Sequence, residues 1–73
     1  MVLVLVFSFT SPGNLKPAQQ ANFVVDEKVA AITLWQAQRQ AQSAGALCNG
    51  ELFEMDLAGL KLIKRKIPEV IIG

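Results

Sequence analysis

The sequence predicts a small α+β domain: a mostly antiparallel sheet with one helix packed on one face. Three observations lead to this class. The N-terminus is an apolar, β-branched run, the stretch "FEMDL" alternates apolar and acidic residues, and one segment rich in alanine and glutamine ends at a glycine. With 73 residues the chain is long enough for one domain, so we expect residues 1–73 to form a single unit.

The composition favours a folded chain that leaves apolar surface exposed. Hydrophobic residues make up 52% of the sequence and charged residues 18%, the reverse of the balance that keeps chains disordered. The mean hydropathy of +0.37 is high for so short a chain. Because little polar surface is available to cover the apolar residues, we expect part of them to meet a partner or a second copy.

The first expected element is a strand over residues 2–9. Val2, Val4 and Val6 alternate with equally apolar neighbours, which is typical of a strand buried on both faces. "SPGN" at residues 11–14 then supplies turn chemistry. The alternative is that residues 2–10 are the apolar region of an export signal, but the first cation comes only at Lys16 and no A-x-A cleavage site follows.

The middle of the chain begins with an expected connector, residues 15–22, in which Pro17 lacks an amide donor. The following stretch allows two interpretations. A long helix from about Asp26 to Ala44 would carry the stripe Ala30, Leu34, Ala37, Ala41 and Ala44. A later start is favoured, in which Thr33 and Gln36 form a capping box and residues 23–25 and 29–32 are short strands.

Both interpretations make residues 34–44 helical, and Gly45 then sits where a helix-ending glycine belongs. The stripe of small residues predicts a close approach to the sheet. Trp35 lies beside the stripe and is a candidate interaction residue, while the opposite face is rich in glutamine and carries Arg39. We expect that glutamine-rich face to be solvated rather than to contact DNA bases, because it has one cation and no positioning helix.

Residues 50–67 fit either a helix or a hairpin, and the hairpin is favoured. As a helix, the segment would place Asp56 and Lys64 in its apolar stripe and Gly59 in its interior. As a hairpin reversing at residues 58–59, it sets Asp56 opposite Lys61 and Met55 opposite Leu62. The hairpin interpretation also sends Arg65 to the face of the acidic residues, and Lys64 and Lys66 to the other face.

The cations near the C-terminus raise the alternative of nucleic-acid binding. The candidate residues are Arg39, Lys61, Lys64, Arg65 and Lys66. A phosphate backbone needs several cations on one face, whereas the hairpin divides these between two, and the net charge of the chain is only +1. No membrane partner is expected, because Asp56 interrupts the apolar stripe that an interfacial helix would need.

Several kinds of chemistry are excluded by the residues themselves. The chain has no histidine and one cysteine, Cys48, so histidine-based catalytic dyads and internal disulfides are impossible, and a structural zinc site is nearly excluded. Glu54 and Asp56 would share a strand face and could hold Mg²⁺, but a solvated face is the favoured interpretation. We therefore expect no catalysis, no cofactor and no metal, and the lone thiol suits a cytoplasmic location.

The sequence thus predicts a small non-catalytic protein-binding or oligomerising module. The candidate interaction residues are Trp35 and the apolar C-terminal segment with Val70, Ile71 and Ile72. That segment follows Pro68 and could add a strand to the sheet edge of a protein partner or of a second copy. The alternative function is an accessory nucleic-acid-binding protein that uses the five cations.

Overall fold

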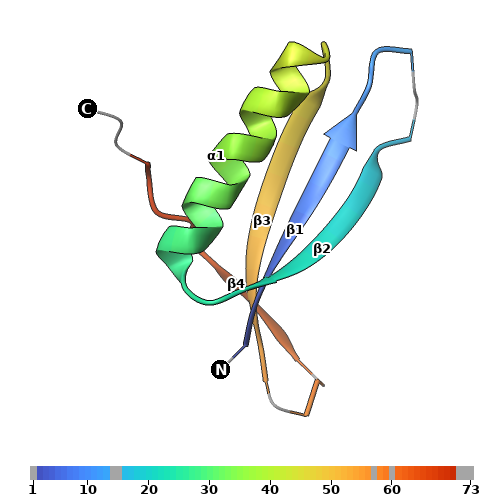
Figure 1. Ribbon diagram of the computed structural model, residues 1–73. Helices are drawn as coiled ribbons and strands as arrows, with labels where there is room; N and C mark the ends of the chain where they lie inside the picture. Colours follow the sequence, from blue (N-terminus) through green and yellow to red (C-terminus); the bar gives the residue numbers. More distant parts are fainter. Residues whose placement is uncertain (1, 14–15, 57, 60, 71–73) are drawn as a thin grey trace.

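The computed structural model describes residues 2–13, 16–56, 58–59 and 61–70. Over these residues the chain forms four strands and one helix in the order strand, strand, helix, strand, strand (Figure 1). Their bounds are β1 (Val2–Thr10), β2 (Ala18–Val24), α1 (Glu27–Ser43), β3 (Leu47–Met55) and β4 (Leu62–Arg65). The predicted α+β class is confirmed.

The strands form one sheet in the order β2-β1-β3-β4, and every neighbouring pair is antiparallel. The apolar strand β1 is therefore central, with β2 on one side and β3 on the other. The helix connects β2 to β3 and lies across one face of the sheet (Figure 1). This is the packing that the sequence predicts for the N-terminal strand, the C-terminal hairpin and the helix.

The core lies between α1 and the sheet. Alternate residues of β1 point at the helix and are buried, namely Leu3, Leu5 and Phe7, and Leu52 of β3 lies beside Leu5. The helix contributes small residues, above all Ala30 and Ala41. Burying the apolar side chains of this layer is the main source of stability in so short a chain.

One glycine sets how closely the helix approaches. Gly50 of β3 faces α1, and a β-carbon at this position would lie 2.5 Å from Cδ1 of Leu34. The missing side chain therefore makes room for Leu34. Small residues along the helix and a glycine in the strand together allow the close approach that the alanine stripe predicts.

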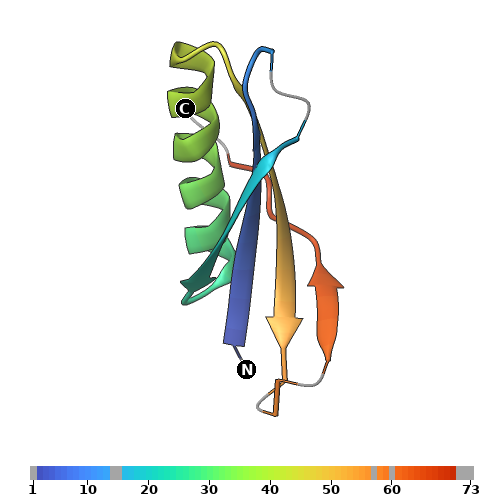
Figure 2. The ribbon, with the colours of Figure 1, turned by 90° about the vertical axis from the view of Figure 1, so that its right-hand side faces the viewer.

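The opposite face of the sheet has no second layer among the described residues. Figure 2 shows α1 on one side of the sheet and nothing against the other side. The Cα positions extend 38 × 35 × 15 Å, the proportions of a thin two-layer structure. Val2, Val4 and Val6 are consequently only half-buried. The prediction that β1 is buried on both faces was wrong, because one helix can cover only one face.

The helix begins earlier than the favoured interpretation placed it. Asp26 is the N-cap, and its carboxylate Oδ1 accepts a hydrogen bond from the amide of Val29 at 2.8 Å. Residues 29–32 are thus helical rather than a strand, and Thr33 and Gln36 lie inside α1 instead of capping it. The β-branched residues of this segment locally favour a strand, but that preference is weak. Burial of Ala30 and Ala31 in the helical conformation outweighs it.

The end of the helix agrees with the sequence prediction. Gly45 has a φ of +74°, the left-handed conformation that glycine adopts most easily. Its amide donates to the carbonyl of Gln42, and the amide of Ala46 donates to that of Ala41 at 2.8 Å. These two bonds are the Schellman arrangement, which satisfies carbonyls that the helix leaves open.

The expected connector at residues 15–22 is largely a strand instead. Residues 18–24 form β2 and pair with β1 from Phe9↔Ala18 to Leu3↔Val24. Polar residues such as Gln19 and Gln20 are tolerated because β2 is an edge strand with one neighbour. Pro17 comes just before the strand, where its missing amide donor breaks no ladder bond. Gly13 has a φ of +84° in the expected turn, while Asn14 lies outside the described residues.

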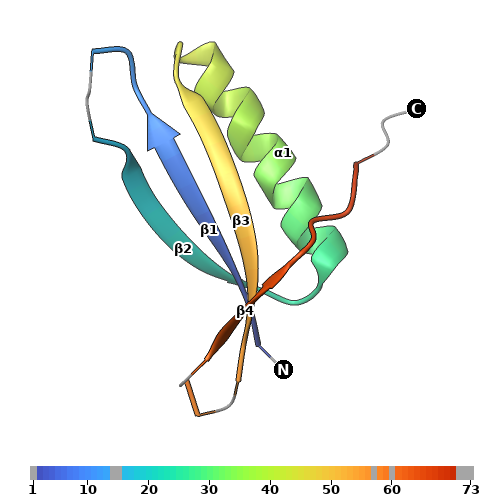
Figure 3. The same cartoon turned by 180° about the vertical axis from the view of Figure 1, so that it is seen from behind.

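The C-terminal hairpin is confirmed in class and in register. Met55 pairs with Leu62 as predicted, and the amide of Asp56 donates to the carbonyl of Lys61 at 3.3 Å. Beyond β4 the chain returns alongside α1 (Figure 3). There Ile67 packs against the core, and Pro68 and Val70 lie near Ala31 and Ile32 of the helix.

Candidate interaction surface

The uncovered side of the sheet, which we call the open face, presents apolar side chains from every strand. The register fixes its membership, because residues paired across strands point the same way. One row runs Phe23, Val4, Phe53 and Lys64 from β2 to β4. The neighbouring rows add Val2, Met55 and Leu62 on one side, and Ala21, Val6 and Glu51 on the other.

The open face is divided along the strands into an apolar half and a polar half. The apolar half lies at the start of β1, where the rows just described meet. Towards the end of β1 the paired residues become Gln19, Ser8 and Asn49, and the last row pairs Thr10 with Leu47, which is 67% exposed. The apolar half is therefore a bounded patch with a polar border, the usual composition of a protein-binding surface.

Two large side chains in this patch are strongly exposed. Phe23 is 75% exposed, and Leu62 is 58% exposed. A phenyl ring held open to water on a rigid strand costs solvation free energy that burial against a partner would recover. Phe23 and Leu62 lie on the two edge strands, so the patch extends across the width of the sheet.

The charges on the open face cancel. Nζ of Lys64 lies 3.8 Å from Oε2 of Glu51, with the two side chains 71% and 58% exposed. At this exposure the pair adds little to stability. Its effect is to leave the patch without net charge, so neither anions nor cations are attracted to it at long range.

The two edges of the sheet are poorly suited to strand addition. The edge strand β2 starts directly after Pro17 and carries glutamines, while β4 has only four residues. Prolines, polar side chains and short strands are the features by which sheet edges avoid pairing with other chains. The face of this sheet is therefore a better interaction surface than its edges.

The interaction residues predicted from the sequence lie elsewhere. Trp35 is half-buried on α1, and the guanidinium of Arg39 lies 4.9 Å from its ring centre. Val70 lines a shallow groove with Ile32 and Pro68 on the helix side. Ile71 and Ile72 lie outside the described residues. Trp35 and Val70 therefore belong to the helix layer, away from the open face.

The five candidate cations do not share one surface. Lys64 lies on the open face, whereas Arg65 points to the helix side, as the hairpin interpretation predicts. Arg39 is on α1, and Lys61 and Lys66 are exposed before and after β4. The cations are thus divided between two faces, which weakens the case for a phosphate-binding track.

Arg65 is held by two carboxylates from different elements. Its Nη2 lies 2.8 Å from Oε1 of Glu27 at the start of α1, and its Nη1 lies 2.9 Å from Oε2 of Glu54 on β3. The hydrogen bond to Glu27, followed by the charges of both carboxylates, raises the pKa of Arg65 further above its usual range. This bridge fastens β4 to the helix, and it engages Glu54, one of the two residues considered for Mg²⁺.

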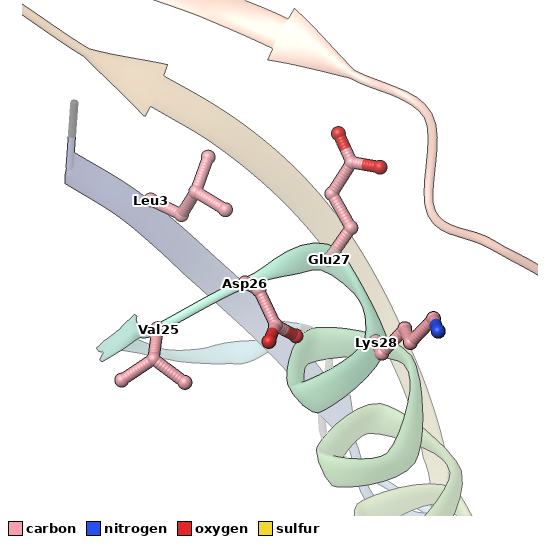
Figure 4. A pocket seen from close by; sticks show the side chains of 5 residues that line it. All are labelled: Leu3, Val25, Asp26, Glu27 and Lys28. Atoms are coloured by element: carbon pink, nitrogen blue, oxygen red, sulfur yellow. The ribbon is translucent and has the colours of Figure 1, made fainter.

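A hollow of about 390 Å³ lies beside the start of the helix (Figure 4). It is lined by Leu3, Val25, Asp26, Glu27 and Lys28. Both of its carboxylates already have partners, because Asp26 caps the helix and Glu27 binds Arg65. Both carboxylates of the hollow are therefore engaged in contacts within the chain.

Cys48 and the acidic residues give no sign of a reactive or metal site. Cys48 is buried against α1, and this burial raises the pKa of its thiol. Across the described ranges, no three cysteine, aspartate or glutamate side chains come together in a way that could hold a metal. The helix of the described chain is not long and apolar enough to cross a membrane.

The open face was missed by the sequence reasoning, although its signal was present. Phe23 was placed in a short strand over residues 23–25 that was joined to residues 29–32, while residues 18–22 were expected to be part of a connector. Ala21 and Phe23 alternate with Gln20 and Asn22, which is the period of a half-buried strand. Pairing that strand with β1 would have placed Phe23 beside Val4.

Comparison with protein-family models, with curated proteins and with solved structures returned no match. No residue role or partner is therefore carried over from a relative. The candidate surface rests on the register, the exposure and the charges of this chain alone.

Proposed function

We propose that the chain is a small non-catalytic interaction module whose binding surface is the open face of the sheet. The observation that supports the proposal most is the bounded apolar patch around Phe23, Val4 and Phe53 on a rigid sheet. The high hydrophobic content of the chain and the small size of its core point the same way. The lone buried thiol agrees with a cytoplasmic location.

The proposed function is the interaction module expected from the sequence, but the proposed binding surface is a different one. The C-terminal segment with Val70 was the first candidate, but Val70 lies in a groove on the helix side. The open face carries the strongly exposed Phe23 and Leu62, and its ion pair of Lys64 with Glu51 is neutral. A surface with these properties selects an apolar, shape-matched partner rather than a charged one.

A site-specific photo-crosslinker tests this proposal in the cells that produce the chain. A benzophenone amino acid replaces Phe23, and the matched control carries it at Ile32, which is 49% exposed on the helix. We expect adducts of defined mass at position 23, identified by mass spectrometry, and fewer at position 32. The added change Leu62→Lys on the open face should abolish them. Equal adducts at both positions would reject the open face as the binding surface.

Nucleic-acid binding is the second candidate, and one observation favours it. Phe23, Phe53 and Lys64 lie in one row of the open face, and bases can stack on such rings. The ion pair of Lys64 with Glu51 and the opposite direction of Arg65 count against it. Fluorescence anisotropy of a labelled single-stranded oligonucleotide at low salt tests this function, and unchanged anisotropy would reject it.

A further inference from the structure

We infer that the partner of the open face is a second copy of this chain, and that the two sheets stack face to face in a two-fold symmetric dimer. The inference rests on the proposed function, because it names the occupant of the same surface. Three properties of the open face support it: its charge balance, its area and the way its rows match under a two-fold axis.

The charge balance permits self-association. Within the paired rows each copy brings one cation and one anion to the patch, Lys64 and Glu51, and they already lie 3.8 Å apart. Two identical surfaces with net charge would repel each other, whereas two neutral ones do not. The chain as a whole has a net charge of only +1, so long-range repulsion between copies is also small.

The area is near the minimum for a specific dimer. The strands have 9, 7, 9 and 4 residues. With about 3.3 Å per residue and about 4.8 Å between strands, one face covers about 460 Å² in projection. Two stacked faces thus enclose about 900 Å² of flat sheet, and the relief of the side chains adds to the accessible area removed. Specific interfaces begin at about 1,000–1,200 Å², so we expect a weak dimer.

The rows of the open face fix the direction of the axis. A two-fold axis parallel to the strands keeps each residue at its height along the sheet but exchanges the two edges. The apolar half of one copy then meets the apolar half of the other. An axis across the strands that passes through the row of Val4 also pairs the two apolar halves, but it leaves the polar half of each sheet outside the contact. The parallel axis is therefore the arrangement that stacks the two faces over their whole length and encloses the larger area.

The parallel axis makes a specific contact. It brings β2 of one copy over β4 of the other, so that Phe23 lies over Lys64 of the second copy. An ammonium group over a phenyl face is attractive, and the apolar stem of the lysine covers the ring. The same operation places Val4 over Phe53 of the second copy. Sheets stacked in this way lie about 10 Å apart with strands rotated by about 30°.

Sedimentation equilibrium of the purified chain tests the dimer. We expect the mass to rise from the monomer value of 7.9 kDa at low concentration towards twice that value, with a dissociation constant on the order of 10 µM. Phe23→Lys should weaken the dimer at least about tenfold, because it buries a charge opposite Lys64 of the second copy. Ile32→Lys, on the helix, should leave it unchanged. A constant monomer mass, or equal effects of the two changes, would overturn the inference.

A chemical cross-link tests the direction of the axis. In a Cys48→Ala background, single cysteines replace Phe23 in one sample and Lys64 in another, and a short bifunctional maleimide is added to each sample and to their mixture. The parallel axis predicts that the mixture gives more cross-linked dimer than either sample alone. A higher yield within the Phe23→Cys sample would reject this axis.

The inference and the proposed function can fail separately. If the purified chain stays monomeric while the crosslinker at position 23 captures a different protein, the second copy is rejected and the interaction module stands. If position 23 captures nothing and the chain stays monomeric, both are rejected. Anisotropy changes with an oligonucleotide at low salt that Phe23→Lys abolishes would assign the open face to nucleic acid instead.

Discussion

Over residues 2–7 the two faces of β1 are both apolar in sequence, but they are very different in the fold. Leu3, Leu5 and Phe7 face α1 and are buried, whereas Val4 and Val6 point the other way and remain half-buried. On the helix side, small residues and Gly50 bring the layers into close contact. On the open side, the same kind of side chain meets no second layer in the described part of the chain. An apolar sequence therefore shows that a face of a sheet is suited to burial. Whether that face is buried depends on the number of helices available to pack on it.

The largest expected difference between the faces comes from truncating a buried and a half-buried residue of the same strand. Leu5 is fully buried, so Leu5→Ala should cost about 2–5 kcal/mol of unfolding free energy. A core of this size supplies only about 3–5 kcal/mol, so much of this variant should be unfolded. Val4→Ala should cost about 1 kcal/mol or less. Urea denaturation at low concentration measures both changes, and equal losses would show that the open face is covered within one chain.

The next effect tests the close contact on the helix side. In Gly50→Ala the new methyl group meets Leu34, so the variant should lose about 1–3 kcal/mol of unfolding free energy. Asn49→Ala is the matched control, because Asn49 is the preceding residue of β3 and points to the open face. The additional change Leu34→Ala should remove most of the penalty of Gly50→Ala. A penalty that persists in the double variant would mean that another contact is responsible.

A smaller effect tests where the helix starts. Asp26→Ala removes the hydrogen bond to the amide of Val29 and should cost about 1 kcal/mol. Thr33→Ala changes a residue inside α1 and should cost less, because alanine has the higher helix propensity. Thermal unfolding followed by circular dichroism compares the two variants. A larger loss in Thr33→Ala would support the later start that the local sequence favours.

The class of the fold and the C-terminal hairpin could be predicted because their signals are local. Phe53 and Met55 alternate with Glu54 and Asp56, and the pairing of Met55 with Leu62 follows once the chain reverses at Gly59. Gly45 likewise marks the helix end without help from distant residues. Period-two alternation and a helix-ending glycine are read from a few neighbouring residues, so tertiary contacts are not needed to see them.

The errors occurred where distant contacts decide the structure. The polar stretch around Gln19 and Gln20 becomes a strand only because β1 offers a free edge with matching register. The residues from Val29 to Ile32 become helical because Ala30 and Ala31 are buried in that conformation. The open face depends on both outcomes, since it needs β2 in place and the only helix of the described chain on the opposite side. Residue patterns along the chain could not supply that combination.

The smallest expected effect is the contribution of the Cys48 thiol to stability at alkaline pH. Cys48 lies on the helix side, where burial raises the pKa of its thiol above the ordinary value of 9.0. The folded chain therefore keeps this proton to higher pH than the unfolded chain. The stability that this group contributes is complete below pH 9.0 and declines as the pH rises through the folded pKa. Cys48→Ala should remove that part of the alkaline loss, as measured by urea denaturation at a series of pH values.

The same thiol gives a direct comparison of the two faces at neutral pH. Cys48 should react slowly with a disulfide reagent, because the thiolate is the reactive form and burial disfavours it. The variant Phe23→Cys in a Cys48→Ala background should react rapidly when dilute, since position 23 is exposed on the open face. Its reaction should slow as the protein concentration rises, because a second copy then covers the thiol. A reaction rate that does not change with protein concentration would mean that position 23 stays exposed. Any self-association of this chain would then not involve the open face.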